Sequence, residues 1–93
     1  MYFDHFHLIY LDYLNLRFNA GLNGQIPIQI GNLINLTELD LSYCDFNGII
    51  PDEICNIPAA DIEYNIDLGW NNLCEPYPEC EEPFSISFQN CLP

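Results

Sequence analysis

The feature that most constrains this chain is a pattern of apolar residues that occurs twice along the sequence. The first copy has leucine at positions 8, 11, 14 and 16, and the second has leucine at positions 33, 36, 39 and 41. Each copy continues into a Gly-x-Ile-Pro stretch, at residues 24–27 and 48–51. The step from Leu14 to Leu39 is typical of stacked repeats, because one unit of this size cannot bury its apolar face alone. The sequence therefore predicts an array of repeats that share one core.

A third, degenerate copy sets the expected organisation of the chain. Ile66 and Leu68 match the paired leucines of the other copies, but Cys74 follows Leu73 where the glycine turn would come. In every copy the paired residues lie two apart, so both point to the same side of a short strand. We place the repeat region at residues 1–73, with repeats at about 8–32, 33–57 and a degenerate 58–73, and a C-terminal cap at residues 74–93.

The pattern resembles the plant-type leucine-rich repeat, LxxLxxLxLxxNxLxGxIPxxIGxLxx, over about residues 8–73. The second copy, LTELDLSYCDFNGIIPDEIC, carries nearly every framework position. This resemblance implies a leucine-rich repeat solenoid, an α/β-type repeat. A short parallel β-sheet would line its concave face, and irregular or 3-10 segments its convex side. The segment CEPYPECEEPFSISFQNC is similar to the cysteine-bearing C-terminal cap of extracellular family members.

The sixth framework position of such repeats is normally asparagine, whose amide can satisfy the backbone groups of the bend. Asn19 and Asn71 occupy this position, and Cys44 occupies it in the middle repeat. A thiol is small, tolerates burial and donates weakly. We therefore interpret Cys44 as a structural thiol that takes the place of the asparagine in the middle repeat.

The other four cysteines, Cys55, Cys74, Cys80 and Cys91, predict two disulfides formed in an oxidising compartment. A zinc site is a weaker alternative, because the Cys-x2-Cys pairs usual for zinc are missing. We favour the pairing Cys74–Cys80 with Cys55–Cys91, and keep Cys55–Cys74 with Cys80–Cys91 as the alternative. Phe84, Ile86 and Phe88 alternate with polar residues and are expected to cover the last repeat with one apolar face.

The charge of the chain excludes several functions. The chain has fourteen acidic residues and one basic residue, Arg17. Neither nucleic acid nor an anionic membrane surface is therefore an expected partner. No apolar run is long enough to cross a bilayer, which argues against membrane insertion. Catalytic motifs and cofactor-binding motifs are missing, so we expect neither an enzyme nor a bound cofactor. His5 and His7 are too few to indicate a metal site.

Residues between the framework leucines are expected to project from the concave face in columns. Phe18, Tyr43 and Trp70 form an aromatic column, which is either a binding strip or packing between neighbouring strands. The polar columns are Asn15, Asp40 and Asp67; Arg17, Ser42 and Gly69; and Tyr13 with Glu38. An acidic column is usually a solvated face, and selection of a basic partner is the alternative.

The resemblance implies a protein–protein recognition module, the C-terminal part of an extracellular or cell-surface domain, with a protein or peptide ligand. Carbohydrate binding, for example to a cell-wall polysaccharide, and a purely structural end-cap role are the alternatives. Terminal repeats need a polar outer face, and none precedes Leu8, so we expect further repeats N-terminal to this chain. Asn35 begins an Asn-x-Thr triplet with Thr37, a weak signal for N-glycosylation.

Overall fold

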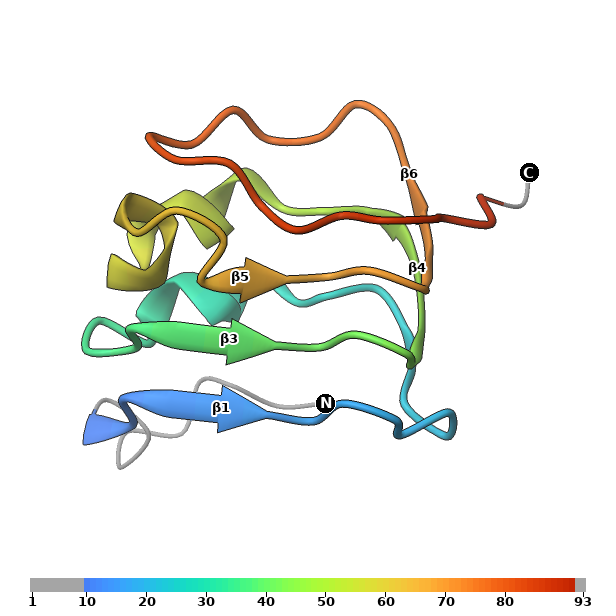
Figure 1. Cartoon of the computed structure of the whole chain (residues 1–93), viewed down its shortest axis with the longest axis horizontal. Helices are drawn as coiled ribbons and strands as arrows, with labels where there is room; N and C mark the ends of the chain where they lie inside the picture. Colours follow the sequence, from blue (N-terminus) through green and yellow to red (C-terminus); the bar gives the residue numbers. More distant parts are fainter. Residues whose placement is uncertain (1–9, 92–93) are drawn as a thin grey trace.

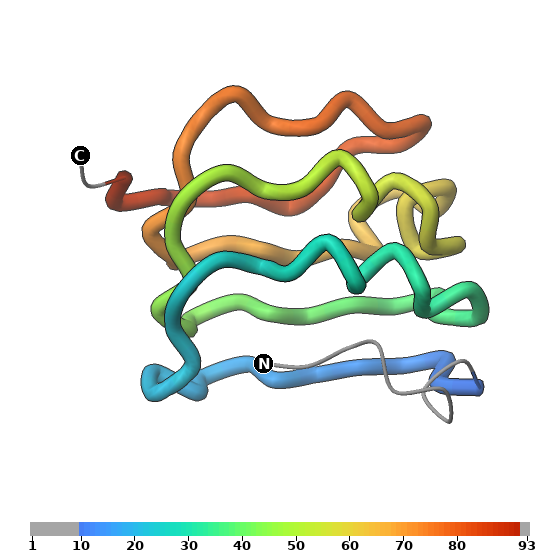
Figure 2. Tube along the Cα trace, turned by 180° about the vertical axis from the view of Figure 1, so that it is seen from behind, coloured from blue at the N-terminus to red at the C-terminus, as the bar shows by residue number. Residues whose placement is uncertain are grey.

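The computed structural model describes residues 10–91. The chain winds through successive turns, and each turn contributes one strand to each of two parallel sheets (Figure 1). The first sheet contains β1 (Tyr13–Asn15), β3 (Glu38–Asp40) and β5 (Ile66–Asp67). The second sheet contains β2 (Asn23–Gly24), β4 (Asp45–Ile49) and β6 (Asn72–Cys74). The chain returns behind the first sheet through 3-10 helices, as Figure 2 shows: η2 (Ile28–Asn32), η3 (Asp52–Asn56) and η4 (Pro58–Asp61).

The parallel pairing expected from the repeats is confirmed. Leu14 pairs with Leu39, and Leu39 pairs with Ile66, so the first sheet follows the alignment of the repeats. A proline precedes both η2 and η3, where its fixed φ suits an extended entry into the turn. Gly24 and Gly48 have φ of 82° and 74°, a region that side chains disfavour.

The core lies between the two sheets and the 3-10 helices. In the middle turn the framework residues are fully buried: Leu36, Leu39, Leu41, Phe46, Ile50 and Ile54. In the first turn the counterparts of Ile50 and Ile54, Ile26 and Ile30, are also buried. The four leucines of that turn are only partly buried: Leu11, Leu14, Leu16 and Leu22. The first apolar layer therefore leaves part of its leucine surface uncovered.

Part of the segment expected to form the C-terminal cap extends the first sheet. Ser85 bridges to Asp67 and Gln89 bridges to Asn71, both in parallel. The N–H of Leu68 donates to the carbonyl of Ser85 at 2.8 Å, and the N–H of Ser85 donates to the carbonyl of Ile66 at 2.8 Å. Residues 85–89 therefore lie beside β5 as a fourth, shortened turn.

This fourth turn corrects the expected packing of the apolar tail residues. Phe84 and Ile86 pack against the core, as the alternation predicted. Phe88 does not, because its φ of 47° turns the side chain out of the alternating pattern. Phe88 is 65% exposed.

Both disulfide pairings considered from the sequence are wrong. The structure joins Cys55 to Cys80 and Cys74 to Cys91, with Cα–Cα distances of 5.1 and 4.9 Å. The segment after β6 crosses the end of the stack to the side where the 3-10 helices lie, and the tail then returns (Figure 1). Cys74 ends β6, whereas Cys80 is bonded to Cys55 of η3, so the crossing segment separates the two cysteines. Cys44 is the free cysteine in the described part of the chain.

Candidate functional site

The face of the β1-β3-β5 sheet carries the candidate site. Its pairing register aligns Asn15 with Asp40, and Asp40 with Asp67, which gives the acidic column. Glu38 pairs with Tyr13 at the start of the strands. Tyr13 contacts this column at Asn15, whose Nδ2 donates a hydrogen bond to the Tyr13 hydroxyl at 3.0 Å.

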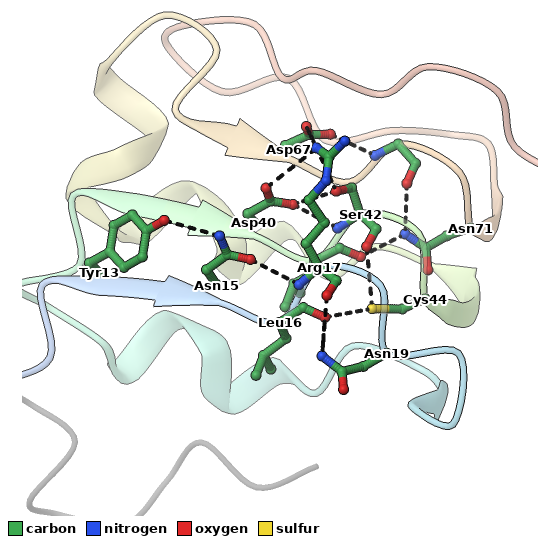
Figure 3. A network of polar contacts seen from close by, with 12 residues as sticks. Tyr13, Asn15, Leu16, Arg17, Asn19, Asp40, Ser42, Cys44, Asp67 and Asn71 are labelled. Carbon is green, nitrogen blue, oxygen red and sulfur yellow. Dashed lines mark hydrogen bonds and ion pairs between the residues drawn. The ribbon is translucent and has the colours of Figure 1, made fainter.

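Arg17 extends from the first turn across the next two turns, as Figure 3 shows. Its Nη1 lies 3.8 Å from Asp40 Oδ2 and 4.0 Å from Asp67 Oδ2. The same nitrogen lies 3.5 Å from the hydroxyl of Ser42. Arg17 is the only arginine or lysine of the chain, so the structure uses it to neutralise part of the acidic column.

The two carboxylates beside Arg17 are held by their own backbone. Asp40 Oδ1 accepts the N–H of Ser42 at 2.9 Å, and Asp67 Oδ1 accepts the N–H of Gly69 at 3.0 Å. Asn15 makes the same contact with the N–H of Arg17 at 2.9 Å. One oxygen of each carboxylate is therefore fixed, and the other, Oδ2, lies within ion-pair distance of the guanidinium.

Four aromatic rings stack along the edge of this face: Phe18, Tyr43, Trp70 and Phe88. We call this stack the aromatic ladder. Successive ring centroids lie 4.6, 5.4 and 4.7 Å apart, with interplanar angles of 29°, 8° and 20°. These distances exceed the contact distance of about 3.5–4 Å between carbon atoms. The rings are therefore offset, and each leaves part of its face open.

The fourth ring, Phe88, was missed from the sequence. Its signal is present, because Ser87-Phe88-Gln89 matches Gly69-Trp70-Asn71 position by position. The step from Trp70 to Phe88 is shorter than the steps from Phe18 to Tyr43 and from Tyr43 to Trp70. A search for a fixed period therefore passes over the last turn.

All four ladder residues have a positive φ: 64°, 54°, 58° and 47° in chain order. This left-handed conformation costs a residue with a side chain about 1–2 kcal/mol, and aromatic residues are rarely found in it. Glycine or asparagine would adopt it with less strain. The chain thus carries its largest side chains at four positions where the backbone favours the smallest.

The guanidinium carbon of Arg17 lies 4.7 Å from the centroid of Phe18 and 4.8 Å from that of Tyr43. Both distances fall within the range of cation–π attraction. The site therefore joins two elements that favour a cation, the acidic column and the N-terminal half of the aromatic ladder.

Polar side chains behind the aromatic ladder donate hydrogen bonds to backbone carbonyls in the bends of the chain. Asn71 is buried, and its Nδ2 donates to the carbonyls of Leu41 and Leu68 at 2.9 and 3.0 Å. Asn19 Nδ2 donates to the carbonyl of Leu16 at 2.7 Å. In the fourth turn Gln89 Nε2 donates to the carbonyl of Leu68 at 2.8 Å, a role that the sequence did not suggest.

Cys44 occupies the same row in the middle turn, and its thiol lies 3.2 Å from the carbonyl oxygen of Leu16. Burial raises the pKa of the Cys44 thiol above its usual 9.0. The thiol therefore stays protonated at neutral pH, and a protonated thiol is a poor nucleophile.

Two further features bear on the chemistry of the site. Within residues 10–91, no group of three or more His, Cys, Asp or Glu side chains could hold a metal ion; His5 and His7 lie outside these residues. In the same range, no helix has the length and apolar character needed to cross a bilayer.

Comparison with known proteins identifies a family and a relative that this chain resembles. A family model described as Leucine Rich Repeat matches residues 35–57. The receptor-like protein EIX1 of Solanum lycopersicum is 41% identical over 66 residues. The matched stretch is 71% of this chain but 6% of that relative, so the chain spans a small part of the relative's length.

Proposed function

Because this chain belongs to the plant-type leucine-rich repeat family, we propose that it is a protein-recognition module. It binds a partner protein or peptide with the β1-β3-β5 face and the aromatic ladder beside it. The observation that carries this proposal is the ladder itself. Phe18, Trp70 and Phe88 are 66%, 45% and 65% exposed, so their rings contribute little to the core.

The strain at the ladder supports a binding role. Residues held in sparsely populated conformations are enriched at functional sites, where the surrounding structure maintains them. Aromatic side chains supply large contact areas with little loss of side-chain entropy on binding, and they dominate the energetics of many protein interfaces. A shallow depression of about 450 Å³ also runs along the ladder, lined in part by Asn71, Asn72 and Asn90. The rings together with Asn72 and Asn90 suit a mixed apolar and polar ligand, whereas the Asn71 amide is already bound to backbone groups.

The ladder gives less support to the carbohydrate alternative. A sugar ring binds best on a whole open aromatic face, and in this stack each inner ring shares its faces with its neighbours. Tyr43 lies between two rings, and Trp70 does the same. The geometry therefore favours side chains that enter between the rings and the acidic column.

We also propose an extracellular or cell-surface location for the protein. The two disulfides, Cys55–Cys80 and Cys74–Cys91, would persist in that oxidising environment. The partly buried first layer of leucines fits a further repeat packed against β1 in a longer protein. In that arrangement the present residues form the C-terminal part of the recognition domain.

A random-peptide display selection against the whole chain tests the proposed function. Selected peptides should lose at least about tenfold in affinity when Tyr43→Ser or Trp70→Ser is introduced, because each change removes a large contact surface. Ile28→Ser is the matched control, since Ile28 is an exposed apolar residue of η2, outside the sheet. Peptides that bind all three variants equally would reject the ladder as the recognition surface and favour the purely structural role.

A further inference from the structure

A row of small residues separates the acidic column from the aromatic ladder: Ser42, Gly69 and Ser87. In the first turn the same position holds Arg17, whose side chain lies along this row. Gly69 has no side chain to stand between Asp67 and the Trp70 ring. A Cβ at this position would lie 3.2 Å from Asp67 Oδ1 and 3.2 Å from the carbonyl oxygen of Ser87. The row therefore places no large side chain between the acidic column and the aromatic ladder in the second, third and fourth turns.

Arg17 shows which chemistry suits the space between the acidic column and the ladder. Its guanidinium lies against two rings and within ion-pair distance of two carboxylates. The guanidinium group is flat, so it stacks on an aromatic ring while its N–H groups point to carboxylates at the edge. Arg17 reaches Phe18 and Tyr43, which form one half of the ladder.

The other half of the ladder is built in the same way. Trp70 and Phe88 stack at 4.7 Å, close to the 4.6 Å of Phe18 and Tyr43. In the described part of the chain, no arginine contacts these two rings, since Arg17 is the sole cationic side chain there. Trp offers the strongest cation–π face of the aromatic residues. Asp67 lies beside this half with its side chain 30% exposed.

We propose that the Trp70–Phe88 half of the ladder, together with Asp67, binds an arginine side chain of the partner. The inference rests on the proposed recognition function and names the chemistry of the ligand. The formal net charge of −13 would attract such a basic segment from a distance. Arg17 and the partner's arginine would share Asp67, so the internal residue competes with the ligand.

A tetra-arginine peptide is the probe for this site, and tetra-citrulline is its neutral control of the same shape. Trp70 is the only tryptophan of the chain, so its fluorescence reports binding at the ladder directly. Tetra-arginine should change the emission of Trp70 in a saturable way that weakens with added salt. Tetra-citrulline should leave the emission unchanged at the same concentrations. Equal responses to both peptides would overturn the proposal.

Two matched variants separate this site from general attraction to an acidic surface. Asp67→Asn should weaken binding of tetra-arginine about tenfold, the loss expected for one charge-assisted contact. Asp52→Asn changes the net charge equally but lies in η3, away from the ladder, and should change the affinity less than about twofold. Equal effects of the two changes would show non-specific attraction and overturn the proposal.

A third variant tests the shared use of Asp67 and does not depend on how Asp67→Asn folds. Arg17→Gln combined with Asp52→Asn keeps the net charge at −13, since one positive and one negative charge are lost together. Binding of tetra-arginine should become at least about threefold tighter, because the internal competitor is gone. Unchanged or weaker binding would contradict a common site.

A failure of the arginine site can be distinguished from a failure of the proposed recognition function. If the display selection returns ladder-dependent peptides without arginine, the recognition function stands and the arginine site is rejected. If no selected peptide depends on Tyr43 or Trp70, the recognition surface itself is rejected.

Discussion

The side-chain oxygen of Asn71 accepts the backbone N–H of Phe46 from the preceding turn, at 3.0 Å. The Nδ2 atom of the same amide donates to carbonyls in two different turns, Leu41 and Leu68. Asn71 is 3% exposed, so water cannot replace these contacts. One buried amide therefore ties two successive turns of the stack together.

Replacement of Asn71 by alanine should lower the free energy of unfolding by about 3 kcal/mol, because it leaves several buried backbone groups without a partner. Asn19→Ala is the control in the same row. Asn19 is exposed and donates to the Leu16 and Arg17 carbonyls of its own turn, so its loss should cost about 0.5–1 kcal/mol. Urea denaturation of both variants measures the difference. Equal losses in the free energy of unfolding would mean that burial does not determine how much each of these asparagines stabilises the fold.

The disulfide connectivity gives a second prediction. Peptide mapping of the non-reduced protein should find Cys55 linked to Cys80 and Cys74 linked to Cys91, with one alkylatable thiol at Cys44. The physical reason is the path of residues 75–80, which carries Cys80 across the end of the stack to η3. A fragment that joins Cys74 to Cys80 would contradict this path.

The parts of the fold that the sequence predicted are those fixed by a regular period. Leucine pairs such as Leu39 and Leu41 recur at nearly constant spacing, so the strands of the first sheet, their parallel order and the columns of side chains followed from it. The aromatic column was found for the same reason. Tyr43 and Trp70 hold equivalent positions in repeats of similar length. The second sheet, β2-β4-β6, was not predicted, because the Gly-x-Ile-Pro stretches were interpreted as turns.

The parts that could not be predicted depend on the path of the chain after the period ends. Cys74 and Cys80 are close in the sequence, but the segment between them spans the stack, so short separation was misleading. Phe88 belongs to a shortened turn, and its outward side chain follows from a positive φ rather than from alternation. A further contact could not be predicted for another reason. Arg17 in the first turn lies beside Asp67 in the third, and no pattern within one repeat indicates that a side chain extends so far.

The Cys44 thiol predicts a difference in stability at alkaline pH. Its pKa is raised in the folded state by burial, above the usual value of 9.0. The folded protein therefore holds the proton more tightly than the unfolded chain. This contribution is fully present below the unfolded pKa and is lost as the pH rises through the folded pKa.

The wild-type protein should accordingly lose more stability than a Cys44→Ser variant as the pH rises from neutral through the folded pKa of the thiol, as measured by thermal unfolding. Burial also raises the pKa of Tyr77 above 10.0. That effect is common to both proteins and cancels in the comparison. Parallel pH profiles would show that the thiol titrates in the folded protein as it does in the unfolded chain.

Truncation of a leucine should lower the stability by different amounts in the first and second leucine layers. Leu39 is fully buried, so Leu39→Ala should destabilise the chain by about 3 kcal/mol or more. Leu14 occupies the same position in the first turn but is only partly buried, and Leu14→Ala should cost about half as much. Urea denaturation compares the two, and an equal loss would mean that the first layer is covered in solution.

Tyr43→Asn decides whether the aromatic ladder serves stability or binding. The change removes stacking with Phe18 and Trp70, worth about 0.5–1.5 kcal/mol for each pair. It also relieves a left-handed backbone that costs tyrosine about 1–2 kcal/mol and that asparagine tolerates better. The two effects nearly cancel, so the free energy of unfolding in urea should change by less than about 1 kcal/mol. A loss of about 3 kcal/mol, as expected for Leu39→Ala, would identify the ring as a packing element, and the strained position would then need no ligand to account for it.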